Sequence, residues 1–130
     1  MNFTPTFLIT DDDLDLRDSL GSLFSASGVR TLFAGDGKEA CQLVQTTEVH
    51  LVLIDFHMPR MTGLEALRVI KQHKQQLPVI LMSAELNQEM SEAVIAADAY
   101  SVHTKPIRID CIRRDIASAM RLAYDWTIDW

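Results

Sequence analysis

Side chains able to bind a metal ion or a phosphate follow short apolar runs at four separate places in this chain of 130 residues. They are Asp11, Asp12 and Asp13 after the first run, Asp55 at the end of the third, Ser83 at the end of the fourth and Lys105 after the fifth. Crowded carboxylates repel one another unless a cation compensates their charge, and Mg²⁺ or Mn²⁺ takes such oxygen ligands. A lysine ammonium can neutralise a phosphate, and a serine hydroxyl can donate a hydrogen bond to it. The set therefore indicates metal-assisted phosphoryl chemistry.

Each of these residues has a simpler interpretation when it is taken alone. An Asp or Ser after a strand is commonly a helix N-cap, and a Lys before Pro is commonly a solvated surface residue. We assign the capping role to Asp13, which precedes a segment of helical periodicity. Capping leaves Asp11 and Asp12 unexplained, so the metal interpretation is favoured for that pair.

Short β-like runs alternate with longer segments of helical periodicity along the whole chain. The runs span residues 7–10, 29–33, 51–55, 79–83 and 100–103, and the helical segments span 13–26, 37–45, 63–73, 87–97 and 108–124. Gly28 is expected to end the first helix in a left-handed conformation. The alternation predicts one α/β domain with a doubly wound parallel sheet. Because ligand sites in such sheets lie beyond the carboxyl ends of the strands, the candidate residues are expected at one rim.

The composition excludes several classes of protein. A net charge of −6, with 12 scattered Lys and Arg residues, argues against a nucleic-acid partner. The N-terminal residues lack the features of an export signal, and no apolar run is long enough to span a membrane. Cys41 and Cys111 are expected to be reduced thiols, which fits a cytoplasmic protein. His50 and His73 are expected to be exposed at the ends of elements.

Four motifs, in order and at suitable spacing, resemble the receiver domains of two-component response regulators. They are FLITDD at 7–12, LVLID at 51–55 with MP at 58–59 and MTGLE at 61–65, VILMSA at 79–84, and TKP at 104–106. The resemblance covers about residues 7–124. It implies a flavodoxin-like fold, in which five parallel strands in the order 2-1-3-4-5 are covered by five helices.

The resemblance also implies a role for each matching acidic residue. Asp55 would accept a phosphoryl group, and Asp12 and Asp55 would bind Mg²⁺ or Mn²⁺ directly. Asp11 would help to hold the ion through water, and the backbone carbonyl of His57 would be a further ligand. Members of this family act as signalling switches that catalyse their own phosphorylation and dephosphorylation.

The same resemblance implies partners and a switching mechanism. The phosphoryl donor would be a phosphohistidine on a sensor histidine kinase or a histidine phosphotransfer protein. Ser83 would contact the new phosphate, and Lys105 would pair with it at an exposed rim, so that Lys105→Ala is expected to fold well. A two-state movement of Ser83 and the loop after it would then alter the face made by the fourth helix and the fifth strand.

Three positions depart from the pattern of the family or vary within it. Val102 lies where the family usually carries an aromatic residue, three positions before the lysine, so an aromatic rotamer switch is not expected. His57 occupies a variable position that influences the lifetime of the phosphoryl group, although a solvated loop residue is an equal interpretation. Arg60 replaces a frequent glycine, and we expect this to change only the surface.

Three other functions fit parts of the pattern. In a haloacid-dehalogenase-like phosphatase Asp11 would be the nucleophile and Asp13 its partner, but Asp15 stands where that family has Thr or Val. In a flavodoxin-like cofactor binder, acids after the first strand would repel an anionic cofactor. A receiver fold that only binds partners, and is never phosphorylated, is the strongest alternative. It would not need the acidic residues together with Ser83 and Lys105.

The last residues are the least determined part of the chain. We assign residues 1–124 to the receiver domain and 125–130 to a C-terminal tail or the start of a linker helix. Apolar residues keep heptad spacing from Ile109 to Trp130, so the last helix is expected to extend through Trp126 and to support a homodimer or a join to an output domain. In the other interpretation, Trp126 and Trp130 fold back onto the domain.

Overall fold

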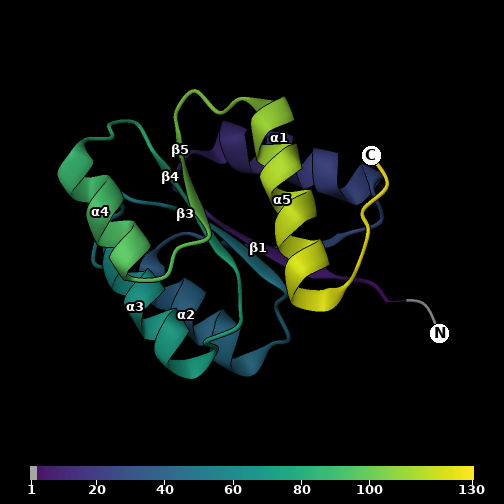
Figure 1. Ribbon diagram of the computed structural model, residues 1–130, viewed down its shortest axis with the longest axis horizontal. Coiled ribbons are helices and arrows are strands. Elements are labelled where there is room, and N and C mark those ends of the chain that lie inside the picture. Colours follow the sequence, from purple (N-terminus) through teal and green to yellow (C-terminus); the bar gives the residue numbers. More distant parts are fainter. Residues whose placement is uncertain (1–2) are drawn as a thin grey trace.

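A computed structural model describes residues 3–130 and contains one five-stranded parallel sheet with five helices (Figure 1). The elements are β1 (Thr6–Thr10), α1 (Leu14–Ala26), β2 (Arg30–Ala34), α2 (Gly37–Thr46), β3 (Leu51–Asp55), α3 (Gly63–His73), β4 (Val79–Ser83), α4 (Gln88–Ala96), β5 (Ser101–Thr104) and α5 (Ile109–Tyr124). The strand order is β2-β1-β3-β4-β5. The predicted fold class is therefore confirmed, and the predicted bounds lie within one residue of the observed ones, apart from the expected extension of the last helix through Trp126.

Two apolar cores form because helices cover both faces of the sheet. Helices α1 and α5 lie on one face, and α2, α3 and α4 lie on the other (Figure 1). Successive residues of a strand point to opposite faces, so Phe7 and Ile9 of β1 enter the α1/α5 core while Leu8 enters the other. Every residue of β1, β3 and β4 is buried. Burial of long aliphatic side chains on both faces makes these central strands a rigid support for their carboxyl ends.

Polar side chains cap the starts of α1, α2, α3 and α4, whereas α5 begins without a side-chain cap. Asp13 accepts a hydrogen bond from Leu16 N at the start of α1, which confirms its predicted capping role. At α3, Thr62 and Glu65 form a reciprocal capping box. Gly28 follows α1 with a φ of 77°, so it provides the predicted left-handed stop.

The predicted extension of the last helix is wrong. Helix α5 ends at Tyr124, because Asp125 adopts a left-handed conformation with a φ of 51° and turns the chain back. Ile128 is buried in the α1/α5 core, and Trp126 and Trp130 pack against the same core. Figure 1 shows this segment running beside α5 towards the end of α1. The tryptophans thus cover apolar surface of their own domain, as in the second interpretation of the tail.

The expectation that His50 is exposed is also wrong. Its side chain is buried at the start of β3, where Nδ1 accepts a hydrogen bond from the backbone N–H of Thr6. Its Nε2 lies 2.9 Å from Glu48 Oε1. The ring therefore joins the starts of β1 and β3. By contrast, the prediction for the cysteines is confirmed, since Cys41 and Cys111 are both free thiols.

Candidate functional site

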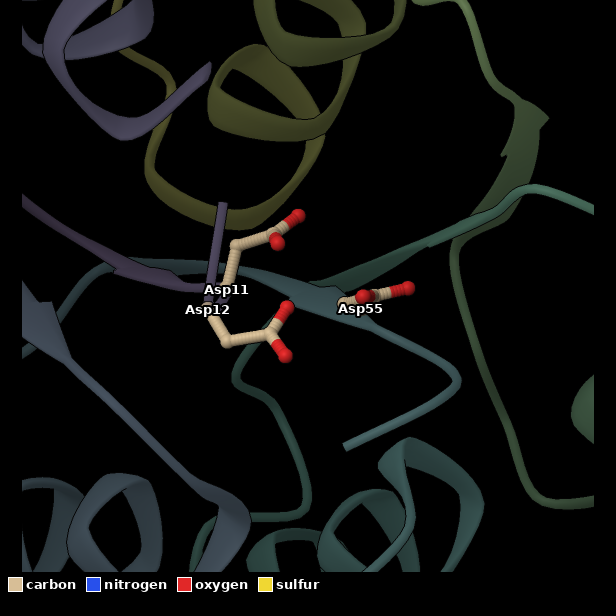
Figure 2. A group of neighbouring side chains, drawn as sticks. All are labelled: Asp11, Asp12 and Asp55. Carbon is tan, nitrogen blue, oxygen red and sulfur yellow. The ribbon is translucent and has the colours of Figure 1, made fainter. Parts of the chain in front are cut away.

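Three carboxylates meet at the carboxyl end of the sheet. Carboxylate oxygens of Asp11, Asp12 and Asp55 all lie within 4.8 Å of one another. Figure 2 shows Asp11 and Asp12 following β1, with Asp55 beside them on β3. Asp11 is fully buried, Asp55 is nearly so, and Asp12 is exposed. The site therefore combines acids held inside the protein with one that faces solvent.

The register of two neighbouring strands accounts for this grouping. Strands β1 and β3 are paired in parallel, and Thr10 lies opposite Ile54. The next residue on each strand, Asp11 and Asp55, therefore emerges at the same level of the sheet. Asp12 follows immediately, before Asp13 begins α1. The gathering of acids is thus a direct consequence of strand order.

Lys105 joins two of these acids. Its Nζ lies 2.8 Å from Asp11 Oδ2 and 3.3 Å from Asp55 Oδ2. The other oxygen of Asp11 accepts the backbone N–H of Asp13 at 2.9 Å. The expected position of Lys105 at an exposed rim needs correction, because its side chain is only 20% exposed. The peptide bond from Lys105 to Pro106 is cis.

The pKa values of Asp55 and Lys105 are both raised, but for different reasons. Burial raises the pKa of Asp55, and the charge of Asp11 raises it further, against the opposite effects of Lys105 and the His57 N–H. Burial alone would lower the pKa of Lys105, but its hydrogen bond to Asp11 and the charges of both acids together raise it. The ammonium thus remains charged and partly offsets the repulsion between the carboxylates.

Ser83 and His57 border this acidic group. Ser83 is fully buried at the end of β4, where its hydroxyl donates to the carbonyl oxygen of Glu85 and accepts the Glu85 N–H at 3.3 Å. The backbone N–H of Lys105 donates to the Ser83 carbonyl at 2.7 Å. His57 donates its backbone N–H to Asp55 Oδ1 at 3.4 Å, while its side chain is exposed. The carboxyl ends of β1, β3, β4 and β5 therefore bring the predicted site residues to one region.

Gly63 supports the site, and the sequence analysis did not identify it as a position that requires glycine. A Cβ atom on Gly63 would lie 2.4 Å from the carbonyl oxygen of Asp55 and 2.8 Å from Phe56 Cα. Helix α3 therefore begins in direct contact with the backbone of the acceptor candidate. The signal was present in the MTGLE motif, where glycine follows the N-cap Thr62.

The donor set fits a hard divalent cation. Carboxylate oxygens are the preferred protein ligands of Mg²⁺ and Mn²⁺, and the exposed side chain of Asp12 gives an ion access from solvent. Burial, and then the charge of Asp11, disfavour the ionised form of Asp55 even beside Lys105. A divalent cation at this group would offset the repulsion between the carboxylates.

Comparison with known proteins agrees with this geometry. Residues 7–117 match the family described as the response regulator receiver domain. The chain is 31% identical to regulatory protein AtoC of Escherichia coli K12 over 88% of its length, and 30% identical to response regulator RR06 of Streptococcus pneumoniae over 90%. The parallel sheet, the acids at its carboxyl edge and the lysine beside them agree with this match. The chain belongs to the response regulator receiver domain family.

Solved structures support the same assignment. The receiver domain of the Francisella response regulator 1452 superposes with a TM-score of 0.81 at 30% identity, covering 92% of this chain and 99% of that one. A CheY-like receiver domain from Methanospirillum hungatei, at 21% identity and a TM-score of 0.90, shares the fold. The matches give no support to the phosphatase or to the cofactor binder.

The match covers only part of the curated relatives. The chain aligns with 25% of AtoC and 54% of RR06. Receiver domains in general bind Mg²⁺ in an acidic pocket and interact with histidine kinases or phosphotransfer proteins. Among residues 3–130, none of the helices has the length and apolar character needed to cross a membrane.

Thermal stability is expected to rise when Mg²⁺ is added. An ion that binds only the folded chain adds about 1.4 kcal/mol to the free energy of unfolding at ten times its Kd. Differential scanning calorimetry in increasing Mg²⁺ would measure the shift. The Asp12→Asn variant should show little of it, because this variant loses an exposed carboxylate of the group. A melting temperature that is independent of Mg²⁺ in the wild type would contradict the metal site.

Lys105→Ala is now expected to destabilise the protein, because it leaves Asp11 buried without its cation. We expect a loss of about 2 kcal/mol in Mg²⁺-free buffer, which is less than for a fully buried ion pair because Lys105 is partly exposed and the Asp13 N–H still binds Asp11. Urea denaturation with and without Mg²⁺ would measure it. The exposed Lys38 of α2 supplies the control, Lys38→Ala. Equal stability of both variants would restore the view of Lys105 as a rim residue.

Proposed function

We propose that this chain accepts a phosphoryl group on Asp55 and changes conformation to transmit a signal. The observation that carries the proposal is the environment of Asp55. One of its oxygens lies 3.3 Å from Lys105 Nζ, and it shares an acidic group with Asp11 and Asp12. The buried strand β3 thus places the Asp55 carboxylate beside the Lys105 ammonium and beside two further acids that can bind a metal ion.

Each residue has a defined part in the proposed site. Asp12 and Asp55 would hold Mg²⁺ or Mn²⁺ directly, Asp11 through water, and His57 through its backbone carbonyl. When bound, the ion neutralises charge on the phosphoryl oxygens and on the acids around them. The hydrogen bond from the His57 N–H to Asp55 Oδ1 orients the carboxylate.

The transfer step itself is a displacement at phosphorus. An oxygen of ionised Asp55 forms the new bond to phosphorus as the bond between phosphorus and the donor nitrogen breaks, and the imidazole leaves with that electron pair. Lys105 stays beside the group and offsets part of the added negative charge. Later attack by water on the acyl phosphate releases phosphate and regenerates the Asp55 carboxylate.

Ser83 is proposed to report the new phosphate. Its hydroxyl now donates within its own loop to Glu85, and that donor can turn to a phosphoryl oxygen only when the Glu85 contact breaks. The loop from β4 to α4 would then move. Val102 of β5 packs against the α2/α3/α4 core. A conformational change at β5 would therefore not depend on an aromatic rotamer at position 102.

The proposed partners follow from the phosphoryl donor. A phosphohistidine on a sensor histidine kinase or phosphotransfer protein must reach the rim beside Asp12. The free thiols of Cys41 and Cys111 fit a reducing, cytoplasmic location. A homodimer built on a helix extended through Trp126 is withdrawn, because α5 ends at Tyr124.

Incubation with acetyl phosphate and Mg²⁺, followed by intact mass spectrometry, tests the proposal. We expect one phosphoryl group per chain, and no addition when EDTA removes the ion. A receiver-like module that only binds partners would keep its unmodified mass under both conditions.

A further inference from the structure

Arg60 adopts a backbone conformation that residues with a side chain usually avoid. Its φ angle is 71°, in the left-handed region that favours glycine. The residue lies in the loop of residues 56–62, which connects β3 to α3. Because a strained residue persists only where its surroundings hold it, the contacts of Arg60 show what holds this loop.

The guanidinium of Arg60 binds the N-terminus of α2. Its Nη1 donates to Oδ2 of Asp36 at 2.9 Å, and Oδ1 of Asp36 accepts the backbone N–H of Glu39 at 2.9 Å as the helix N-cap. The Glu39 N–H, together with Arg60, holds the pKa of Asp36 below its usual value. The Asp36 side chain is 14% exposed, whereas that of Arg60 is 77% exposed. The carboxylate is thus charged and oriented by the cap, and it offers Arg60 a fixed partner on a solvent-facing surface.

An apolar contact lies beside this ion pair. A Cβ atom on Gly37 would lie 3.0 Å from the carbonyl oxygen of Met61, so glycine lets the loop come close to α2. The Sδ atom of Met61 lies 3.9 Å from Cys41 Sγ, also on α2. Helix α2 therefore contacts two successive residues of the loop, Arg60 and Met61.

The same loop begins at the candidate acceptor. Asp55 Oδ1 accepts the backbone N–H of His57, three residues before Arg60. At its other end the loop is held by the capping box of Thr62 and by the contact of Gly63 with the Asp55 carbonyl. Between these two ends His57 and Pro59 are exposed, while Met58 between them is buried in the core and the Met61 N–H donates to the Pro59 carbonyl at 2.8 Å. The α2 contacts of Arg60 and Met61 therefore act beside these local anchors of the loop.

We propose that Arg60 is a positioning residue, whose ion pair with Asp36 holds the loop of residues 56–62 on α2 and thereby fixes the His57 backbone beside Asp55. This inference rests on the proposed function, in which the carbonyl oxygen of His57 is a metal ligand. It replaces the expectation that an arginine at this position changes only the surface. Helix α2 thus becomes part of the support of the phosphorylation site.

Four variants distinguish the effect of the ion pair from the effects of backbone conformation and helix capping. Arg60→Asn removes the cation but keeps a residue that tolerates the left-handed conformation. Asp36→Asn keeps a good N-cap but removes the anion. Arg60→Lys keeps the cation as a conservative rescue, and the double variant Arg60→Asn/Asp36→Asn tests whether the two residues act together.

Hydrogen exchange of the metal-free protein gives the first readout, independent of phosphorylation. We expect the hydrogen-bonded amides of His57 and Met61 to exchange about twofold to fivefold faster in Arg60→Asn and Asp36→Asn. The double variant should add little to either, and Arg60→Lys should restore most of the protection. Unchanged exchange in both single variants would overturn the proposal.

The Mg²⁺ requirement of labelling by acetyl phosphate gives the second readout. The half-saturating Mg²⁺ concentration should rise about threefold to tenfold in both single variants, while the rate at saturating Mg²⁺ stays within about twofold. If exchange changes but this requirement does not, the loop is held without positioning a metal ligand, and the proposal fails. If exchange responds while the wild type takes up no phosphoryl group, the proposed function fails but the role of Arg60 in holding the loop stands.

Discussion

Asp55→Asn should abolish phosphoryl acceptance, with the labelling rate reduced on the order of a hundredfold or more, because an amide cannot replace the carboxylate nucleophile. The same substitution should raise the melting temperature. Asp55 is buried beside Asp11, and its raised pKa shows that its ionised form is disfavoured in the folded protein. Time courses of intact mass and thermal melts of the same samples would measure both effects.

The appropriate control for this substitution is Asp13→Asn. Asp13 is exposed and caps α1, and Asn is an equally good N-cap, so labelling and stability should both stay near wild type. Labelling of Asp55→Asn at the wild-type yield would contradict the role of Asp55. It would direct attention to Asp11 as the nucleophile.

The pH dependence of this stability difference has a defined sign. The pKa of Asp55 is raised in the folded protein from its ordinary value of 3.8. A raised carboxyl pKa stabilises the fold below the unfolded value, and that contribution is lost as the pH rises through the folded value. The advantage of Asp55→Asn in melting temperature should therefore grow as the pH rises above 3.8 and level off above the folded pKa. A constant difference across this range would contradict the assigned cause.

Gly63→Ala should destabilise the protein by about 3 kcal/mol or more, since the added Cβ meets backbone atoms that cannot rotate away. The nearest is the Asp55 carbonyl oxygen, at 2.4 Å. Relief would require α3 to move from the end of β3, which would also displace Asp55. We therefore expect loss of labelling in whatever fraction remains folded.

Gly35→Ala is the matched control for this prediction. A Cβ atom at Gly35 has no heavy atom within 4 Å, so its cost should stay within about 0.5 kcal/mol. Urea denaturation would give the free energies of unfolding of both variants. Equal stabilities would show that the contact of α3 with the Asp55 backbone can be relieved at little cost.

The elements of this fold were predictable because each carries its own local pattern. Runs of β-branched and aliphatic residues between polar residues marked β1, β3 and β4, and Asp13 and Gly28 marked the ends of α1. Parallel strands that end at one edge then brought Asp11 and Asp55 together without further information.

Contacts between distant residues were not predictable in the same way. The ion pair of Lys105 with buried Asp11 joins residues at opposite ends of the chain, and its geometry depends on the packed sheet. The turn at Asp125 overrode a heptad pattern that was locally consistent with a longer helix. The pairing of Arg60 with Asp36 depends likewise on a loop meeting another helix.

The central claim is that Asp55 carries the phosphoryl group, and mapping the modified residue tests it most directly. Wild-type protein would be labelled with acetyl phosphate and Mg²⁺, reduced with borohydride to trap the acyl phosphate as homoserine, digested, and analysed by tandem mass spectrometry. We predict homoserine at position 55 alone. Homoserine at position 11 or 12 with an unmodified Asp55, or no reduced residue in any peptide, would contradict the account.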